Sequence, residues 1–133
     1  MLIPALHFCG NCEEAIALYE KAFNTKAEDI VRHCDYDPVN YAGDRQISHS
    51  SMKIHGQTVF LNDYDELVNK DNPHSFPVHV ILYFQTEEEL LACYEILKDE
   101  KAANHPFVKT PYSSLCGNFT DKVGMLWGFM VMS

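Results

Sequence analysis

Two cysteines spaced as Cys-x-x-Cys are the first residues of this chain that could do chemistry. Cys9 and Cys12 lie where a short apolar run gives way to a helix-like pattern. A helix N-terminus lowers the pKa of a nearby thiol, and thiol–disulfide oxidoreductases activate their nucleophile in this way. The adjacent acidic pair Glu13 and Glu14 opposes thiolate formation, and the flanking sequence does not predict a thioredoxin-like βαβ unit. The pattern favours a chance pairing, with a thiol redox protein using Cys9 and Cys12 as an alternative.

Histidines form the second group with catalytic or metal-binding potential. His49 and His79 fall within strand-like runs, where a side chain is held on one face of a sheet. Either one could act as a general base or contribute to a metal site. The other five are expected in loops or at the ends of elements, exposed to solvent: His7, His33, His55, His74 and His105.

The elements that must position these residues occur twice. Residues 13–20 read Glu-Glu-Ala-Ile-Ala-Leu-Tyr-Glu, and residues 88–95 read Glu-Glu-Leu-Leu-Ala-Cys-Tyr-Glu, so five of eight positions are identical at an offset of 75. Each copy follows an apolar run and a helix-capping residue, Asn11 or Thr86. A repeat of half the chain length predicts two copies of one supersecondary unit that pack together. The leading glutamates are expected to favour the positive helix end rather than to act as acids or bases.

Each copy is predicted to contain a strand, a helix and three further strands. Strands are expected at 2–9, 27–32, 46–55 and 57–62 in the first copy, and at 77–84, 107–112, 118–122 and 125–132 in the second. Residues 33–44 are polar and are expected to form a loop. We therefore expect a single α+β domain over 1–133, with module 1 at about 1–63, a linker at about 64–76 and module 2 at about 77–133.

The composition excludes several classes of function. The formal net charge of −9 opposes binding to nucleic acid, and the scattered basic residues form no patch for an anionic membrane surface. No apolar run is long enough to span a bilayer, and we expect no secretory signal. Five cysteines are an odd number and a poor disulfide framework, so we expect a cytoplasmic protein.

Three short motifs together span nearly the whole chain. The first is Gly10-Asn11-Cys12-Glu13-Glu14-Ala15, continued by Leu18-Tyr19 and Phe23, the second is His49-Ser50-Ser51-Met52-Lys53-Ile54, and the third is Thr120-Asp121-Lys122-Val123-Gly124-Met125-Leu126-Trp127. Their order and spacing resemble the PhnB-like branch of the vicinal-oxygen-chelate superfamily, which contains glyoxalase I, bleomycin-resistance proteins and extradiol dioxygenases. The resemblance implies tandem βαβββ modules whose mixed sheets curl around a cup, with the helices outside.

The resemblance also implies where metal ligands would lie. Metal-dependent members carry His, Gln or Glu on the first and last strands of each module. Carried over through the repeat, these positions are Pro4, Phe60, His79 and Gly128, or Leu61 and Phe129 if the last strand is shifted by one residue. Only His79 can be a ligand, whereas a catalytic metal site needs about three protein ligands. We therefore expect no metal and no cofactor.

The same positions suggest what lines the cup instead. Strand alternation places His79, Ile81 and Tyr83 on one face, and Phe60 and Asn62 on another. If these faces form the superfamily's cup, they make an apolar and aromatic pocket with a few polar groups. For His79, a hydrogen-bonded core histidine is the alternative.

Two further residues enter the pocket only through the resemblance. His49 belongs to the second motif, and Tyr112 stands about where the branch has a Trp-Gly pair on the segment that closes the cup. Trp127 alternates with Gly128 and is expected in the core under a helix.

These observations lead to one functional expectation and two alternatives. We expect a PhnB-like protein that binds a small organic molecule in an apolar cup without a metal. The first alternative is a metal-dependent or His-based enzyme of the same superfamily, of the lyase, isomerase or dioxygenase type, and the second is the thiol redox protein. The resemblance further implies a homodimer.

Overall fold

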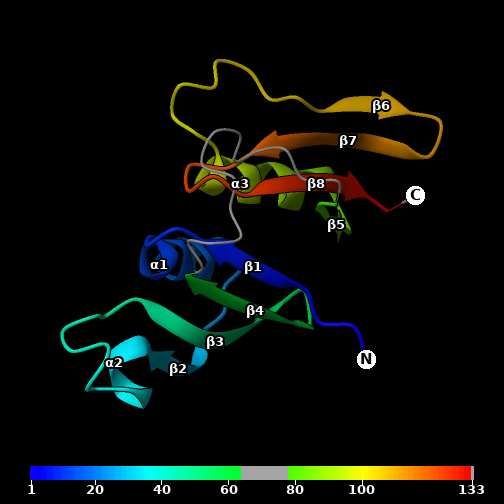
Figure 1. The fold of residues 1–133 in the computed structure, drawn as a ribbon. Coiled ribbons are helices and arrows are strands. Elements are labelled where there is room, and N and C mark those ends of the chain that lie inside the picture. The colour runs from blue at the N-terminus through cyan, green and yellow to red at the C-terminus, as the bar shows by residue number, and fades with distance from the viewer. Residues whose placement is uncertain (64–77, 133) are drawn as a thin grey trace. The chain divides into compact units, whose positions relative to one another are not determined.

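Each half of the chain forms a four-stranded mixed sheet with one eleven-residue helix (Figure 1). The computed structural model describes residues 1–63 and 78–132. They belong to two compact units, Met1–Asp71 and Asn72–Ser133. The linker predicted at about 64–76 lies outside the described residues. The prediction of a single domain with modules at about 1–63 and 77–133 stays a prediction.

The first unit contains four strands and two helices. In chain order they are β1 (Ala5–Phe8), α1 (Cys12–Ala22), β2 (Glu28–Arg32), α2 (His33–Tyr36), β3 (Ile47–Ile54) and β4 (Gln57–Asp63). The strands lie in the order β1-β4-β3-β2, with β1 parallel to β4 and the other neighbours antiparallel. A parallel neighbour requires a crossover connection, and α1 begins this crossover.

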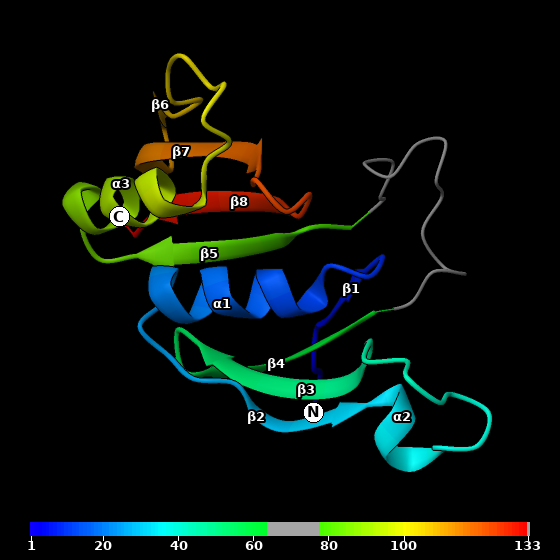
Figure 2. The same cartoon turned by 90° about the vertical axis from the view of Figure 1, so that its left-hand side faces the viewer.

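The second unit repeats this topology. Its elements are β5 (Val80–Phe84), α3 (Glu87–Leu97), β6 (Val108–Thr110), β7 (Ser113–Thr120) and β8 (Leu126–Val131). The strand order is β5-β8-β7-β6, again with one parallel pair, and Figure 2 shows β5, β8 and β7 side by side. The doubled βαβββ unit is therefore confirmed. No helix within residues 1–63 and 78–132 has the length and apolar character needed to cross a membrane.

Apolar residues of each helix pack against alternate residues of its own sheet. In the first unit, Tyr19 of α1 lies against Phe8 of β1, with ring centroids 6.3 Å apart. In the second unit, Tyr94 of α3 meets Phe119 of β7 edge-on at 4.9 Å. Trp127 is 1% exposed, which confirms the prediction that it lies in the core. One face of each sheet is thus filled by its helix, and the opposite face carries the remaining side chains.

The third sequence motif proves to be a structural hairpin. Asp121 is buried, and its Oδ1 accepts hydrogen bonds from the backbone N–H groups of Val123 (3.0 Å) and Met125 (2.9 Å). Its Oδ2 accepts from the indole Nε1 of Trp127 at 2.8 Å. A carboxylate that accepts several hydrogen bonds fixes the turn between β7 and β8. The spacing of Asp121 and Trp127 in this motif therefore has a folding role.

Two elements differ from the sequence prediction. Residues 33–44 were expected to be a loop, but they begin with the short helix α2, where Asp35 Oδ2 accepts from the backbone N–H of Arg32 at 2.9 Å. The strand expected at 118–122 begins earlier, at Ser113, because Ser113 is buried and donates its hydroxyl to the carbonyl of Val131 at 2.9 Å. Both segments are locally polar, and the sequence prediction therefore missed the helix α2 and the first residues of the strand β7.

Candidate functional site

All candidate residues except Tyr112 lie on the sheet face of each unit that its helix leaves uncovered. We call these the open faces: His7, His49, Phe60 and Asn62 in the first unit, and His79, Ile81, Tyr83, Asn118 and Gly128 in the second. Along β5 the alternation is clear, because Leu82 and Phe84 are buried whereas Ile81 and Tyr83 are 50% and 54% exposed. The predicted grouping of candidates by strand alternation therefore agrees with their positions in the sheets.

On the first open face, four side chains form two contacting pairs. The rings of His49 and Phe60 meet edge-on with centroids 4.8 Å apart. His7 lies opposite Asn62 in the parallel register of β1 and β4, and its Nδ1 is 2.6 Å from Asn62 Oδ1. His7 was expected at the end of a strand and exposed to solvent. It does lie near the end of β1, but the expected exposure was wrong, because His7 is half-buried. The sequence signal for a strand position of His7 was its place between two apolar residues, Leu6 and Phe8, which are both buried.

On the second open face, three side chains converge over Gly128. A Cβ atom placed on Gly128 would lie 2.9 Å from Asn118 Oδ1, 3.1 Å from His79 Nε2 and 3.1 Å from Ile81 Cγ1. Ile81 and Asn118 flank Gly128 in register on β5 and β7, and His79 immediately precedes β5. Sequence reasoning missed Asn118, because nothing in its local pattern distinguishes it from any strand asparagine.

Tyr112 is the one candidate that lies apart from the others of its unit. It occupies the turn between β6 and β7 and is 61% exposed. Asn118 lies six residues further on, which along a strand corresponds to roughly 20 Å. Within the second unit, Tyr112 is therefore not part of the cluster over Gly128.

The residues at the implied metal positions do not fit a metal ion. Ala5 pairs with Phe60 and Ile81 pairs with Gly128, so with Phe60 and Gly128 taken as equivalent the first strands of the two units repeat at an offset of 76, one more than the helices. The repeat partner of His79 is therefore Ile3 rather than Pro4, and neither can be a ligand. Phe60 and Gly128 likewise offer no donor atom. Within the described residues, no group of three or more His, Cys, Asp and Glu side chains is placed to hold a metal.

The thiols of the Cys-x-x-Cys pair differ in environment. Cys9 is exposed, whereas Cys12 is fully buried in the first turn of α1. Burial, together with the nearby carboxylates of Asp63 and Glu13, raises the pKa of Cys12 to about 12. Cys12 is therefore a protonated thiol at neutral pH, with poor nucleophilicity.

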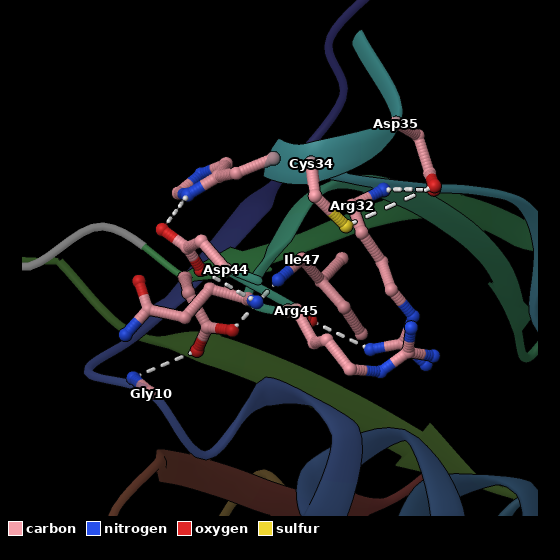
Figure 3. Close-up of polar contacts among 10 residues, drawn as sticks. Gly10, Arg32, Cys34, Asp35, Asp44, Arg45 and Ile47 are labelled. Carbon is pink, nitrogen blue, oxygen red and sulfur yellow. Dashed lines mark hydrogen bonds and ion pairs between the residues drawn. The ribbon is translucent and has the colours of Figure 1, made fainter. Parts of the chain in front are cut away.

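A buried carboxylate joins the start of α1 to β3 and β4. Asp63 Oδ1 accepts from the backbone N–H groups of Gly10 (2.8 Å) and Cys12 (3.0 Å), and its Oδ2 accepts from that of Ile47 (2.9 Å). Gly10 and Ile47, whose backbone N–H groups donate to the two carboxylate oxygens of Asp63, are labelled in Figure 3. Asn11 is the N-cap residue of α1, as expected, but its side chain makes no capping hydrogen bond, and the Cys12 N–H donates to Asp63. The contact aligns β1 and β3, which carry His7 and His49.

Comparisons with known proteins place these observations in a family. The family model described as the Glyoxalase/Bleomycin resistance protein/Dioxygenase superfamily matches residues 3–129. No curated protein matches the chain.

Solved structures agree with this assignment. The PhnB protein of Bacillus cereus, which carries a provisional label as a 3-demethylubiquinone-9 3-methyltransferase, is 25% identical, with a TM-score of 0.73 and 98% coverage of both chains. A protein of Pseudomonas aeruginosa is 20% identical, with a TM-score of 0.80 and coverage of 99% of this chain and 97% of its own. FosX of Listeria monocytogenes is 12% identical, with a TM-score of 0.62 and coverage of 100% and 93%. The chain belongs to the Glyoxalase/Bleomycin resistance protein/Dioxygenase superfamily.

Proposed function

We propose that this protein binds a small organic molecule on the open faces of its sheets, through apolar contacts and hydrogen bonds rather than through a protein-bound metal ion. The proposal rests on the residues at the implied metal-ligand position in the last strand of each module, Phe60 and Gly128. Phe60 packs against His49, and the space beside Gly128 is occupied by Asn118, His79 and Ile81. An aromatic ring and a glycine at these positions favour direct contact with an organic ligand.

Exposed apolar side chains on the second open face support this reading. Ile81 and Tyr83 are each about half exposed on a strand whose alternate residues are buried. Exposed large apolar groups that share one face with a few polar groups are typical of small-molecule sites. By the superfamily resemblance, we further propose that the protein acts as a cytoplasmic homodimer.

The relatives' names add little about the ligand. FosX is named a fosfomycin resistance protein, and at 12% identity it supports the shared fold alone. The PhnB protein at 25% identity supports the branch. The ligand of this protein must therefore be found by experiment.

Native mass spectrometry of the protein as isolated tests the proposal. We expect an organic adduct of low molecular mass that dissociates on activation, and elemental analysis of the same sample should show less than one tenth of a divalent ion per chain. Stoichiometric zinc, nickel, manganese or iron that is retained through dialysis would overturn the proposal. That result would favour the metal-dependent enzyme instead.

A His-based enzyme of the same fold is separated from a binding protein by turnover. If His49 or His79 were a general base, the protein would convert members of a dicarbonyl or catechol panel, and His79→Gln or His49→Gln would abolish that conversion. We expect no turnover by the wild-type protein. The raised pKa of Cys12 gives no support to the thiol redox alternative.

A further inference from the structure

We propose that Asn118 and His79 form a hydrogen-bonding anchor over Gly128 that receives a neutral carbonyl oxygen of the ligand. This inference rests on the proposed function and names the ligand chemistry of the second open face. The anchor lies at the position that the superfamily resemblance assigns to a metal ligand, where this chain has a glycine. Direct hydrogen bonds from two side chains would thus replace coordination by an ion.

The three strands bring the two polar groups to one point. Asn118 Oδ1 and His79 Nε2 lie 2.9 and 3.1 Å from the position of a Cβ on Gly128, so they are at most 6.0 Å apart. A hydrogen bond spans about 2.9 Å between heavy atoms, so one oxygen atom between the two groups can reach both. Rotation of the carboxamide presents its NH₂ group to that oxygen, and the imidazole donates from Nε2.

The polar groups of this cluster are available to a ligand. Among residues 1–63 and 78–132, neither the His79 ring nor the Asn118 carboxamide takes part in a side-chain hydrogen bond, and Asn118 is exposed. The first open face is different, because its histidine and asparagine are hydrogen-bonded to each other: His7 Nδ1 and Asn62 Oδ1 are 2.6 Å apart. The His79 ring and the Asn118 carboxamide of the second unit are therefore the pair that can hydrogen-bond to a ligand.

Glycine is required for this convergence. Any side chain at position 128 would place its Cβ within 3.1 Å of all three neighbours, and ordinary carbon contacts are about 3.5–4.0 Å. Gly128→Ala would therefore displace the Asn118 carboxamide and the His79 ring from the shared point. The absence of a side chain is part of the site.

The surroundings select a neutral oxygen attached to an apolar group. Ile81 and Tyr83 extend the same face with half-exposed apolar surface. The cluster over Gly128 contains no Lys or Arg, and the chain carries a net charge of −9, so a carboxylate would lack a compensating cation. Ketone, amide and ester carbonyls meet both requirements.

Two probes that differ in a carbonyl oxygen separate the anchor from apolar binding. Acetophenone carries a carbonyl oxygen beside its ring, and ethylbenzene keeps the ring and the two-carbon side chain but has no oxygen. Both are titrated into ¹⁵N-labelled protein by NMR, following the Asn118 side-chain amide and the His79 ring nitrogens. We expect acetophenone to shift both sets of signals and to bind about fivefold more tightly than ethylbenzene, the contribution of roughly one net hydrogen bond.

Three variants and a matched control complete the design. Asn118→Ala, His79→Phe and Gly128→Ala should each weaken acetophenone binding by about fivefold and leave ethylbenzene binding within about twofold. Asn104→Ala, an exposed asparagine of the same unit, should change neither affinity. Fluorescence of Trp127, the single tryptophan of the chain, verifies that each variant is folded.

The possible outcomes distinguish this inference from the proposed function. Equal binding of the two probes, or equal losses of both in the variants, would overturn the anchor and leave an apolar binding site in place. Binding of neither probe to the wild-type protein would overturn both proposals. Zinc binding that disappears in His79→Phe would show that His79 is a metal ligand, and it would also overturn both.

Discussion

At the residue scale, buried carboxylates carry much of the local structure. Asp63 receives three backbone N–H groups from two segments, and Asp121 receives two backbone N–H groups and an indole N–H. Hydrogen bonds to an ionised group are roughly twice as strong as neutral ones, and they explain why acidic side chains are tolerated in these interiors. Both aspartates therefore have structural rather than catalytic roles.

Asp63→Asn should destabilise the protein by about 2 kcal/mol. The amide keeps one acceptor for Gly10 and Cys12 but turns an NH₂ group toward the Ile47 N–H, so two donors face each other. Urea denaturation followed by far-UV circular dichroism measures the loss. Glu28→Gln removes an exposed carboxylate from β2 and serves as the control. Equal stability of the two variants would contradict the role given to Asp63.

The thiols should react in order of exposure. Burial raises the pKa of both Cys12 and Cys93 to about 12, whereas Cys9 is exposed. At pH 8 iodoacetamide should therefore alkylate Cys9 in the native protein and leave Cys12 and Cys93 intact, as peptide mass spectrometry can determine. Rapid alkylation of native Cys12 would instead indicate an activated thiol and revive the redox alternative.

The same pKa shifts have a consequence for stability at high pH. In an ordinary environment, such as that of the unfolded chain, the thiols of Cys12 and Cys93 have a pKa of 9.0. In the folded state burial raises the pKa of both thiols to about 12. Between these values the folded state binds more protons than the unfolded state, so stability should fall as pH rises from about 9 to about 12. Replacing both cysteines with Ala should flatten this part of the pH–stability curve, measured by thermal unfolding.

At the element scale, close backbone approach positions the segment before β6 against β7. A Cβ on Gly117 would lie 2.8 Å from the carbonyl oxygen of Pro106 and 3.0 Å from the Phe107 ring. Phe107 is buried and packs against Tyr94 and Phe119, with centroids 5.0 and 6.0 Å apart. The glycine in β7 thus lets an irregular segment cover the aromatic core of the second unit.

Gly117→Ala should cost about 1–3 kcal/mol, because backbone atoms on one side leave the new methyl group no room. Trp127 lies on the neighbouring strand β8, opposite Phe119, so its fluorescence reports urea unfolding of this sheet. Ser114→Ala, at an exposed position of the same strand, should be nearly neutral. A Gly117→Ala variant as stable as this control would show that the segment at 106–107 moves without cost.

At the scale of the whole molecule, the repeated topology and the exposed apolar residues bear on assembly. Both units present open faces, and Ile81, Tyr83 and Val108 expose half or more of their surface in the second unit. Exposed apolar groups of this kind favour association. With the homodimer implied by the superfamily, we expect sedimentation equilibrium to give twice the chain mass of 15.2 kDa. A single-chain mass at micromolar concentration would reject the dimer.

Much of the fold could be predicted because its signals are local. The helix motifs at 13–20 and 88–95, identical at five of eight positions, together with the turns at Gly56 and Gly124, predicted two units of equal topology. Thr86 caps α3 as expected, and its Oγ1 accepts from the backbone N–H of Glu89 at 3.1 Å. The burial of Trp127 followed from its alternation with Gly128, which the resemblance places on the opposite face. Periodicity, capping and turn residues act over a few positions, so one chain suffices to detect them.

The site depended on contacts between distant parts of the chain. Nothing near Asn118 indicates that its carboxamide and the His79 ring both lie beside Gly128, and nothing near Asp63 indicates that it holds the start of α1. The strand registers that create these contacts are set when buried faces pack, and a shift of one residue would reverse every side chain. By itself the sequence determined the repeated order of one strand, one long helix and three strands. Only the tertiary structure decided which of their side chains meet, because meeting depends on packing between residues tens of positions apart.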